Sequence, residues 1–268
     1  LSETAAVLGE NRFTNQFIAA EWRQIVDSWQ IDSWEEYRTV PRIGRKTRLP
    51  ESSRSDLWRI FQIVKDRLHS EGLTTKAKMY QDLAEIISSS RRFPYDYAVV
   101  DEAQDVSVTQ LRFLAALGSS RPDGLFFAGD LGQRIFQQPF SWLALGVDIR
   151  GRSRNLKVNY RTSHQIRSQA DLLLDPEITD VDGNREDRLG TISVFNGSLP
   201  IIRRAASQVE EIEAVSDWIK SRVEEDIETH EIGVFVRSAK ELDRARVAAT
   251  NSDVEYAILD ETIHPSEG

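Results

Sequence analysis

Apolar residues in the first 90 positions recur at helical spacing. They lie three or four residues apart from Phe13 to Trp29, again from Leu57 to Leu68, and again from Tyr80 to Ile87. Such stripes predict amphipathic helices that bury one face. Two prolines and a glycine interrupt the pattern between Arg38 and Arg54, and this composition predicts a loop or a broken helix.

The pattern changes after Pro94 to short, continuous apolar runs. Residues 97–100 form one such run and residues 125–128 form another, and each stops abruptly at polar residues or glycine. Between them, apolar residues from Leu111 to Leu117 predict a helix that ends at Gly118. Continuous apolar strands joined by a helix are typical of a parallel sheet buried on both faces, so we expect an α/β fold.

The second half of the chain continues the alternation of strands and helices. Residues 175–188 are rich in Asp, Glu and Gly and predict a solvated loop or insertion. The expected elements are a strand at 156–160, a helix from Thr162, a strand at 192–195, a helix at 209–223, a strand at 232–236, and a further helix and strand ending at Leu259.

Composition excludes several classes of protein. About 40% of the 268 residues are apolar, which is enough for a real core. There is no cysteine, so disulfides, thiolate metal sites and thiol nucleophiles are excluded. The sequence has no apolar run of about 18 residues and no signal peptide. We therefore expect a cytoplasmic location, and the first residue, Leu1, suggests a processed or excised piece.

Charge is distributed unevenly along a chain whose net charge is −9. The stretch from Arg38 to Arg67 carries nine Lys or Arg against three Asp or Glu, and residues 150–167 carry six bases and no acids. A basic stretch of this kind is either a solvated helix face or a surface that contacts phosphates.

The strongest candidate for chemistry follows the first predicted strand. Asp101, Glu102 and Asp105 come directly after the apolar residues 97–100. In open α/β sheets, ligands bind at the carboxyl ends of the strands. One carboxylate there can hold Mg²⁺, and a neighbour can orient or deprotonate a water molecule. A charged loop with no such role is the alternative interpretation.

Two more polar segments follow the next predicted strands. The second strand leads into Gly-Asp-Leu-Gly-Gln-Arg-Ile-Phe at residues 129–136, and the third leads into Asn-Tyr-Arg-Thr-Ser at residues 159–163. Together with Asp-Glu-Ala-Gln-Asp at 101–105, they resemble motifs II, III and IV of the UvrD/Rep-type superfamily 1 helicases, in the family's order. We call them the motif II, motif III and motif IV segments.

The resemblance implies an ATP-driven motor on single-stranded or junction DNA, built from two RecA-like P-loop NTPase domains. It implies that Asp101 holds Mg²⁺ and that Glu102 activates the attacking water. Gln133 would sense the γ-phosphate, Tyr160 would stack on the adenine, and Arg161 would act as an arginine finger on the γ-phosphate.

Contacts with DNA are expected from aromatic and basic residues. Phe136 stands where the family usually has a tyrosine, and Trp142 follows soon after, so either could stack on an unpaired base. The alternative is that these rings pack in the core. In the basic stretch, we expect Arg42, Arg45 and Arg48 to contact phosphates.

Family features needed for a working motor are missing from this sequence. It has no P-loop of the form G-x-x-x-x-G-K-[ST], because Gly44-Arg45-Lys46-Thr47 lacks the earlier glycine. The resemblance then implies a central fragment of a longer helicase, with incomplete RecA-like domains. Residues 1–92 would be a helical subdomain inserted in the first domain, residues 93–152 part of that domain, and residues 153–268 part of the second.

Three functional hypotheses remain open. The first is a fragment of an ATP-dependent DNA helicase or translocase that is inactive without its P-loop and flanking segments. The second is a non-catalytic module for nucleic-acid or protein interaction that retains a degenerate helicase fold. The third is a metal-dependent hydrolase built on Asp101, Glu102 and Asp105, although two-metal sites need more converging ligands.

Overall fold

The computed structural model describes residues 13–42, 49–90, 93–130, 133, 139–173, 177–187 and 190–259. Its helices and strands fall into two compact units, residues 1–198 and residues 199–268. The domain boundaries at residues 92 and 152 that the resemblance implies remain predictions. None of the described helices is long and apolar enough to cross a membrane.

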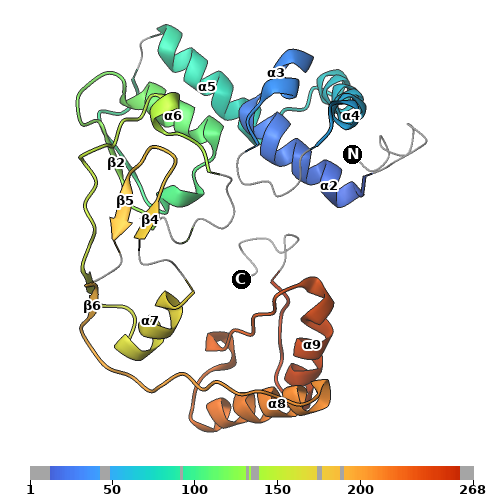
Figure 1. Ribbon diagram of the computed structural model, residues 1–268, viewed down its shortest axis with the longest axis vertical. Coiled ribbons are helices and arrows are strands. Elements are labelled where there is room, and N and C mark those ends of the chain that lie inside the picture. Colours follow the sequence, from blue (N-terminus) through green and yellow to red (C-terminus); the bar gives the residue numbers. More distant parts are fainter. Residues whose placement is uncertain are drawn as a thin grey trace. The chain divides into compact units, whose positions relative to one another are not determined.

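The first part of the chain is helical, as its apolar stripes predict (Figure 1). Thr14 caps the first helix, and Ser33 forms a capping box with Glu36, which explains where these two helices begin. The elements are α2 (Asn15–Glu21), the π-helix η1 (Trp22–Asp27), α3 (Trp34–Thr39), α4 (Glu51–Ser70) and α5 (Lys76–Ser90).

A first core, the helical core, lies among α2, η1, α3 and α4. Tyr37 and Phe61 are fully buried and meet edge to face, with ring centroids 5.7 Å apart. The carboxylate of Glu21, also fully buried, accepts hydrogen bonds from the Tyr37 hydroxyl at 2.7 Å and from Nη2 of Arg42 at 3.1 Å. Burial and the negative charge of Glu21 raise the pKa of Tyr37, so this hydroxyl stays protonated and donates.

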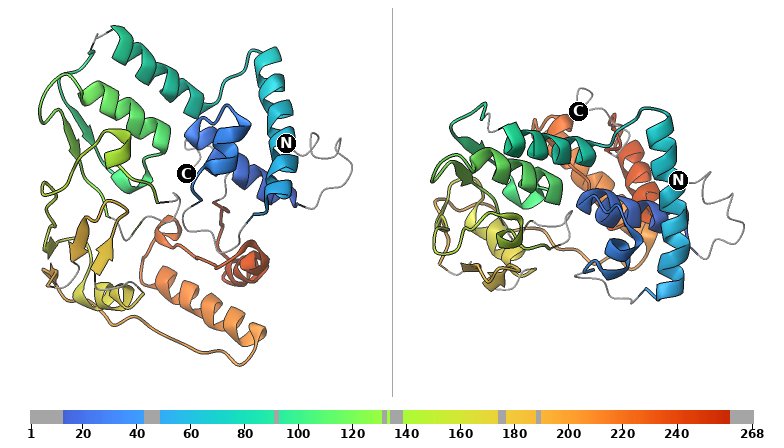
Figure 2. Two further views of the ribbon diagram at one scale, coloured as in Figure 1. Left: turned by 45° about the horizontal axis from the view of Figure 1, so that its top comes forward. Right: turned by 90° about the horizontal axis from the view of Figure 1, so that it is seen from above.

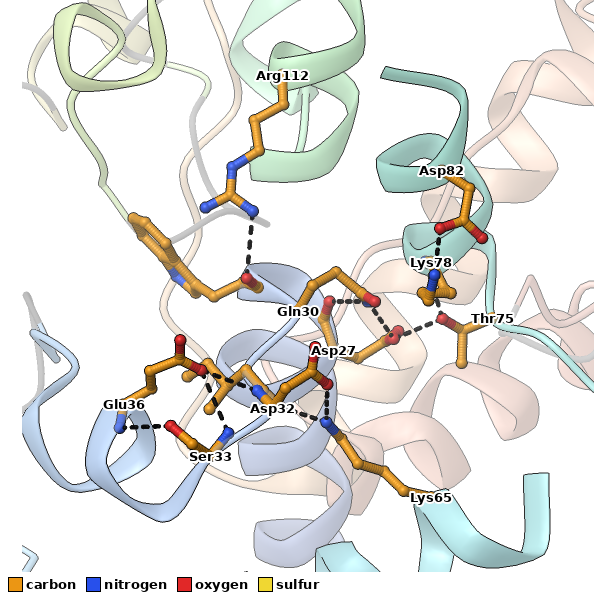
Figure 3. Close-up of polar contacts among 12 residues, drawn as sticks. Asp27, Gln30, Asp32, Ser33, Glu36, Lys65, Thr75, Lys78, Asp82 and Arg112 are labelled. Carbon is orange, nitrogen blue, oxygen red and sulfur yellow. Dashed lines mark hydrogen bonds and ion pairs between the residues drawn. The ribbon is translucent and has the colours of Figure 1, made fainter. Parts of the chain in front are cut away.

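A polar network fixes the turn that follows η1 (Figure 3). Asp27 Oδ1 accepts hydrogen bonds from Thr75 Oγ1 at 2.5 Å and from Gln30 Nε2 at 3.0 Å. Burial raises the pKa of Asp27, although both hydrogen bonds oppose this effect. Lys65 of α4 donates to Asp32 Oδ1 at 2.6 Å. The network therefore joins residues 27–32 to α4 and to the start of α5.

The α/β part begins with two parallel strands, β1 (Ala98–Val100) and β2 (Leu125–Phe127), paired in register from Ala98 with Leu125. The helix α6 (Val108–Gly118), capped by Ser107, connects them and lies beside α5 (Figures 1 and 2). Arg112 of α6 donates to the carbonyl of Trp29, and this bond connects α6 to the helical part of the chain. Burial lowers the pKa of the Arg112 guanidinium.

The packing of β1 and β2 differs from the prediction of a sheet buried on both faces. Val100 and Phe127 pack toward a second core, which includes Leu111 of α6 and Trp142. On the opposite face, Val99 and its register partner Phe126 are 76% and 64% exposed. None of the described elements covers that face, so an apolar run did not imply burial on both sides.

The remaining elements of the first unit are short. The 3-10 turn η4 (Leu143–Leu145) precedes β3 (Val158–Asn159), which pairs in parallel with β6 (Ile192–Ser193). Ser163 caps α7 (His164–Asp171) as the polar helix start predicts. Residues 175–188 were expected to be a solvated loop or an insertion, and they contain the antiparallel pair β4 (Glu177–Thr179) and β5 (Arg185–Asp187). Gly183, at φ 81°, permits the tight turn between the two strands.

Among its described residues, the second unit contains the α-helices α8 (Gln208–Glu224) and α9 (Leu242–Asn251), both as predicted, and the 3-10 turns η5 (Thr229–Glu231) and η6 (Ala239–Glu241). They pack through Ile219, Ala248 and Ala249, and the Ser252 hydroxyl donates to the Ala248 carbonyl. The strands expected at 232–236 and before Leu259 are absent from the described residues. A strand needs a hydrogen-bonded neighbour, and within this unit the described residues form no ladder.

Candidate nucleotide-hydrolysis site

The motif II segment leaves the carboxyl end of β1 with both acidic side chains exposed to solvent. Asp101 Oδ1 accepts a hydrogen bond from the backbone N–H of Glu102 at 2.9 Å. Its second oxygen has no protein partner among the described residues. Glu102 adopts a left-handed backbone, φ 50° and ψ 43°, which costs a non-glycine residue about 1–3 kcal/mol. The chain therefore turns sharply here and leaves both carboxylates facing outward at the strand end.

The motif III segment reaches the same edge from β2. The N–H of Ala128 donates to the carbonyl of Val100 at 2.8 Å, and the N–H of Ala103 donates back to the carbonyl of Ala128 at 2.9 Å. These bonds continue the parallel pairing beyond the strands. Asp130 thus lies next to the motif II segment, as expected for neighbouring strands at the carboxyl edge of a sheet.

Gln104 connects the two segments, a role that was not predicted from the sequence. Its side chain is buried, and its Nε2 donates to Glu102 Oε2 at 2.6 Å while its Oε1 accepts from the N–H of Asp130 at 3.1 Å. An amide between two carboxylates in Asp-Glu-Ala-Gln-Asp is the sequence feature that could have drawn attention to it.

Gln133 stands at the same edge. Its Nε2 donates to Asp130 Oδ2 at 2.9 Å, and its backbone N–H donates to the Asp130 carbonyl at 3.0 Å. Asp130 therefore orients the side chain that was expected to sense a phosphate. Phe136 lies outside the described residues.

The carboxylates do not form a ready-made multi-ligand metal cluster. Asp105 closes the 3-10 turn η2 (Ala103–Asp105) and is exposed. Among the described residues, no group of three or more His, Asp or Glu side chains is placed to hold one ion. This geometry gives no support to a hydrolase whose metal is held by Asp101, Glu102 and Asp105 together.

The motif IV segment follows β3 in a turn that Asn159 fixes. Its Oδ1 accepts from the N–H of Arg161 at 2.9 Å and from the N–H of Thr162 at 3.0 Å. Tyr160 is 75% exposed, and the exposed Arg161 side chain forms no hydrogen bond or ion pair with the described residues. Both side chains are free to meet a ligand. Asn159 was not expected to have this positioning role.

An open cavity of about 1620 Å³ lies within the first unit. Its lining includes Gln104 and Asp130 from the first strand pair and Asn159, Tyr160 and Arg161 from the motif IV segment. Asp101, Glu102 and Gln133 are not among its lining residues. The cavity thus brings the motif IV segment toward the edge that carries motifs II and III, and it is large enough for a nucleotide.

Two residues expected to bind nucleic acid have structural contacts instead. Trp142 is 7% exposed and meets Phe127 edge to face, with ring centroids 4.8 Å apart, so its indole has no free face for a base. The side chain of Arg42 is 11% exposed and pairs with buried Glu21. Arg45 and Arg48 lie outside the described residues.

Most of the other bases in the stretch from Arg38 to Arg67 also have protein partners. Arg38 pairs with Glu51 at 3.5 Å, and Arg67 pairs with Glu71 at 2.8 Å. Arg59 on α4 differs, because it is exposed and has no recorded partner among the described residues. Local ion pairs therefore account for much of this basic stretch.

The strand pair and the polar residues at its carboxyl edge place the chain in the α/β class. Residues 45–138 match the family model described as UvrD/REP helicase N-terminal domain. The match includes the motif II and motif III segments, and it confirms the resemblance of this chain to a UvrD/Rep-type helicase fragment. A comparison with curated proteins found no match.

Proposed function

We propose that this chain is part of an ATP-dependent DNA helicase or translocase that couples ATP hydrolysis to movement on single-stranded DNA. One observation carries the proposal. Glu102 of the motif II segment and Asp130 of the motif III segment, which are 28 positions apart in the sequence, are hydrogen-bonded to the same buried amide. The candidate base Glu102 is thereby linked to Asp130, whose side chain in turn accepts a hydrogen bond from the candidate sensor Gln133. The RecA-like architecture, with the boundaries given above, is part of the proposal.

The residues at the edge fit Mg²⁺ and a nucleotide. The outward-facing oxygen of Asp101 is the kind of hard ligand that Mg²⁺ takes, usually one or two carboxylates with the substrate's phosphates and water. When bound, Mg²⁺ would neutralise charge on the phosphate oxygens. Asp101 would hold the ion, together with the Ser or Thr hydroxyl that a P-loop supplies in P-loop NTPases.

Glu102 would act as the general base. Its carboxylate is solvent-accessible, and its Oε2 is fixed by Gln104, so a water can approach Oε1. Gln133 would then contact the terminal phosphate with its amide, and Asp130 would hold it in place. Both roles need the side chains of Glu102 and Gln133 to lie at the carboxyl edge of β1 and β2, and their hydrogen bonds to Gln104 and Asp130 are consistent with that position.

Tyr160 and Arg161 would complete the site from the second domain. An exposed phenol ring can stack on adenine, and an unpaired guanidinium can bind the oxygens of a phosphoryl group. An arginine that meets the transferring phosphoryl group can raise the rate about 10³–10⁵-fold. Asn159 Oδ1 accepts from the N–H groups of Arg161 and Thr162 and so fixes the backbone that presents both side chains.

Single-stranded or junction DNA is the proposed partner. Arg45, Arg48 and Phe136 remain candidates for its phosphates and bases, and Arg59 joins them because it is exposed. If phosphate contacts supply the affinity, DNA binding should weaken steeply as salt rises, without sequence preference.

ATP hydrolysis with and without single-stranded DNA tests the proposal, with Glu102→Gln as the control. This chain has no P-loop sequence, so we expect very weak binding of Mg·ATP by calorimetry and no hydrolysis above the control. The natural polypeptide, if it supplies a P-loop, should hydrolyse ATP faster when DNA is added. If that polypeptide has no P-loop and no activity, the non-catalytic interaction module replaces the motor.

A further inference from the structure

The buried amide of Gln104 has a fixed orientation. The N–H of Asp130 can only donate, so it needs Oε1 of Gln104, and the Glu102 carboxylate only accepts, so it needs Nε2. Exchanging the two ends of the amide would oppose donor to donor and acceptor to acceptor. Gln104 is only 4% exposed, so its amide depends mainly on these two protein partners.

The backbone around Gln104 is shaped to keep both bonds. A Cβ on Gly129 would lie 2.6 Å from Gln104 Oε1 and 3.1 Å from the Ala103 backbone nitrogen, so only glycine allows this close approach. On the other side, Glu102 has a left-handed backbone, and its Oε2 accepts the hydrogen bond from Gln104 Nε2. Three positions that are separate in the sequence therefore serve one pair of hydrogen bonds.

We propose that Gln104 is a positioning residue that couples the motif III segment to the carboxylate of Glu102. The inference rests on the proposed function and names a step within it. When nucleic-acid binding displaces Asp130 and Gln133, the hydrogen bond from the Asp130 N–H either displaces Gln104 Oε1 or breaks. Because the amide group is rigid, Gln104 Nε2 then moves relative to Glu102. This movement changes the orientation of the Glu102 carboxylate toward the attacking water. Gln104 itself touches no reacting atom.

Three substitutions separate the two bonds. Gln104→Glu keeps an acceptor for the Asp130 N–H but replaces the donor to Glu102 with a carboxylate that repels it. Gln104→Met keeps the volume and removes both. Gly129→Ala leaves Gln104 unchanged but displaces its Oε1. Gln110→Met is the matched control, because Gln110 is a nearby glutamine whose side chain caps α6 at Ser107 and contacts neither segment.

In the natural polypeptide that hydrolyses ATP, we expect kcat to fall about 10–100-fold in all three variants, as for a displaced reacting group. The KM for ATP and the affinity for DNA should stay within about twofold, and the stimulation by single-stranded DNA should be lost. Gln110→Met should lower thermal stability but keep kcat. If Gln104→Met keeps wild-type kcat and stimulation, the coupling role is refuted. If the wild-type polypeptide itself is inactive, the proposed function fails instead.

A second measurement uses this chain and requires no activity. In ¹⁵N NMR spectra, Glu102→Gln should shift both the side-chain amide of Gln104 and the backbone amide of Asp130. Asp101→Asn, which removes a neighbouring carboxylate that does not bond to Gln104, should shift them much less. In a Gln104→Met background, Glu102→Gln should no longer move the Asp130 amide. An Asp130 amide that is indifferent to Glu102, or that still responds without Gln104, would overturn the inference.

Discussion

Replacing Arg42 with Ala should destabilise the helical core, although the sequence alone suggested a DNA contact at this position. Arg42 donates to Glu21 Oε1 from Nε at 3.2 Å and from Nη2 at 3.1 Å, and its guanidinium lies 4.8 Å from the centre of the Tyr37 ring. Glu21 is fully buried, so the substitution removes the positive charge that offsets a buried carboxylate. Breaking a buried ion pair from one side costs about 3–5 kcal/mol.

Urea unfolding followed by tryptophan fluorescence measures this loss. The fluorescence reports mainly on the helical part, because four of the six tryptophans lie there: Trp22, Trp29, Trp34 and Trp58. Arg59→Ala removes an exposed arginine from the same region and should change the free energy of unfolding by less than about 0.5 kcal/mol.

A double variant tests the cause of the loss. Glu21→Gln combined with Arg42→Met removes both charges, keeps the volume and leaves an amide oxygen to accept from the buried Tyr37 hydroxyl. It should therefore recover at least half of the stability lost in Arg42→Ala. If Arg42→Ala costs less than about 1 kcal/mol, or if it weakens DNA binding without destabilising the core, the structural interpretation of Arg42 is refuted.

Further predictions concern a buried acid, a core aromatic, a tight contact and DNA binding. Burial raises the pKa of Asp27 above 3.8, so the stability that this group contributes is present at low pH and is lost as pH rises through the folded-state pKa. Asp27→Asn should therefore unfold at a higher urea concentration than wild type at pH 7. At pH 3 the variant should show no such advantage. Trp142→Ala should cost about 3–5 kcal/mol in thermal unfolding, and any loss of DNA affinity should follow the unfolded fraction. Gly118→Ala should cost about 1–3 kcal/mol, because its Cβ would lie 2.5 Å from Leu125 Cγ. Arg45→Ala with Arg48→Ala should weaken single-strand binding at low salt while unfolding stays unchanged, and unaltered affinity would reject that surface.

The sequence predicted most helices because their positions depend on local patterns. The stripe through α4 and the Ser163 cap of α7 are encoded by residues close together in the chain. The prediction of a strand at 232–236 was wrong, because a strand depends on a hydrogen-bonded neighbouring strand that no local pattern reveals. Similarly, the pairing of Arg42 with Glu21 spans 21 positions, and charge counts along the chain cannot anticipate it.

The two strand ends that form the candidate site were predictable from the sequence, but the residue that joins them was not. The carboxylates of the motif II segment and the polar residues of the motif III segment stand out because they follow apolar strands. The role of Gln104 became visible only when the two strand ends were brought together, since its partners lie 2 and 26 positions away. Trp142 shows the opposite error, because an aromatic side chain beside a motif is as compatible with a core position as with a ligand.

The exposed face of β1 and β2 has a consequence for the behaviour of the chain in solution. Val99 and Phe126 form an adjacent pair of bare apolar side chains on a sheet surface. At neutral pH, a net charge of −9 keeps copies of the chain apart, but that repulsion disappears near the isoelectric point of about 5.1. Colloidal stability should therefore fall sharply below about pH 6, and adding charge at Phe126 should widen the range of pH over which the chain remains monodisperse.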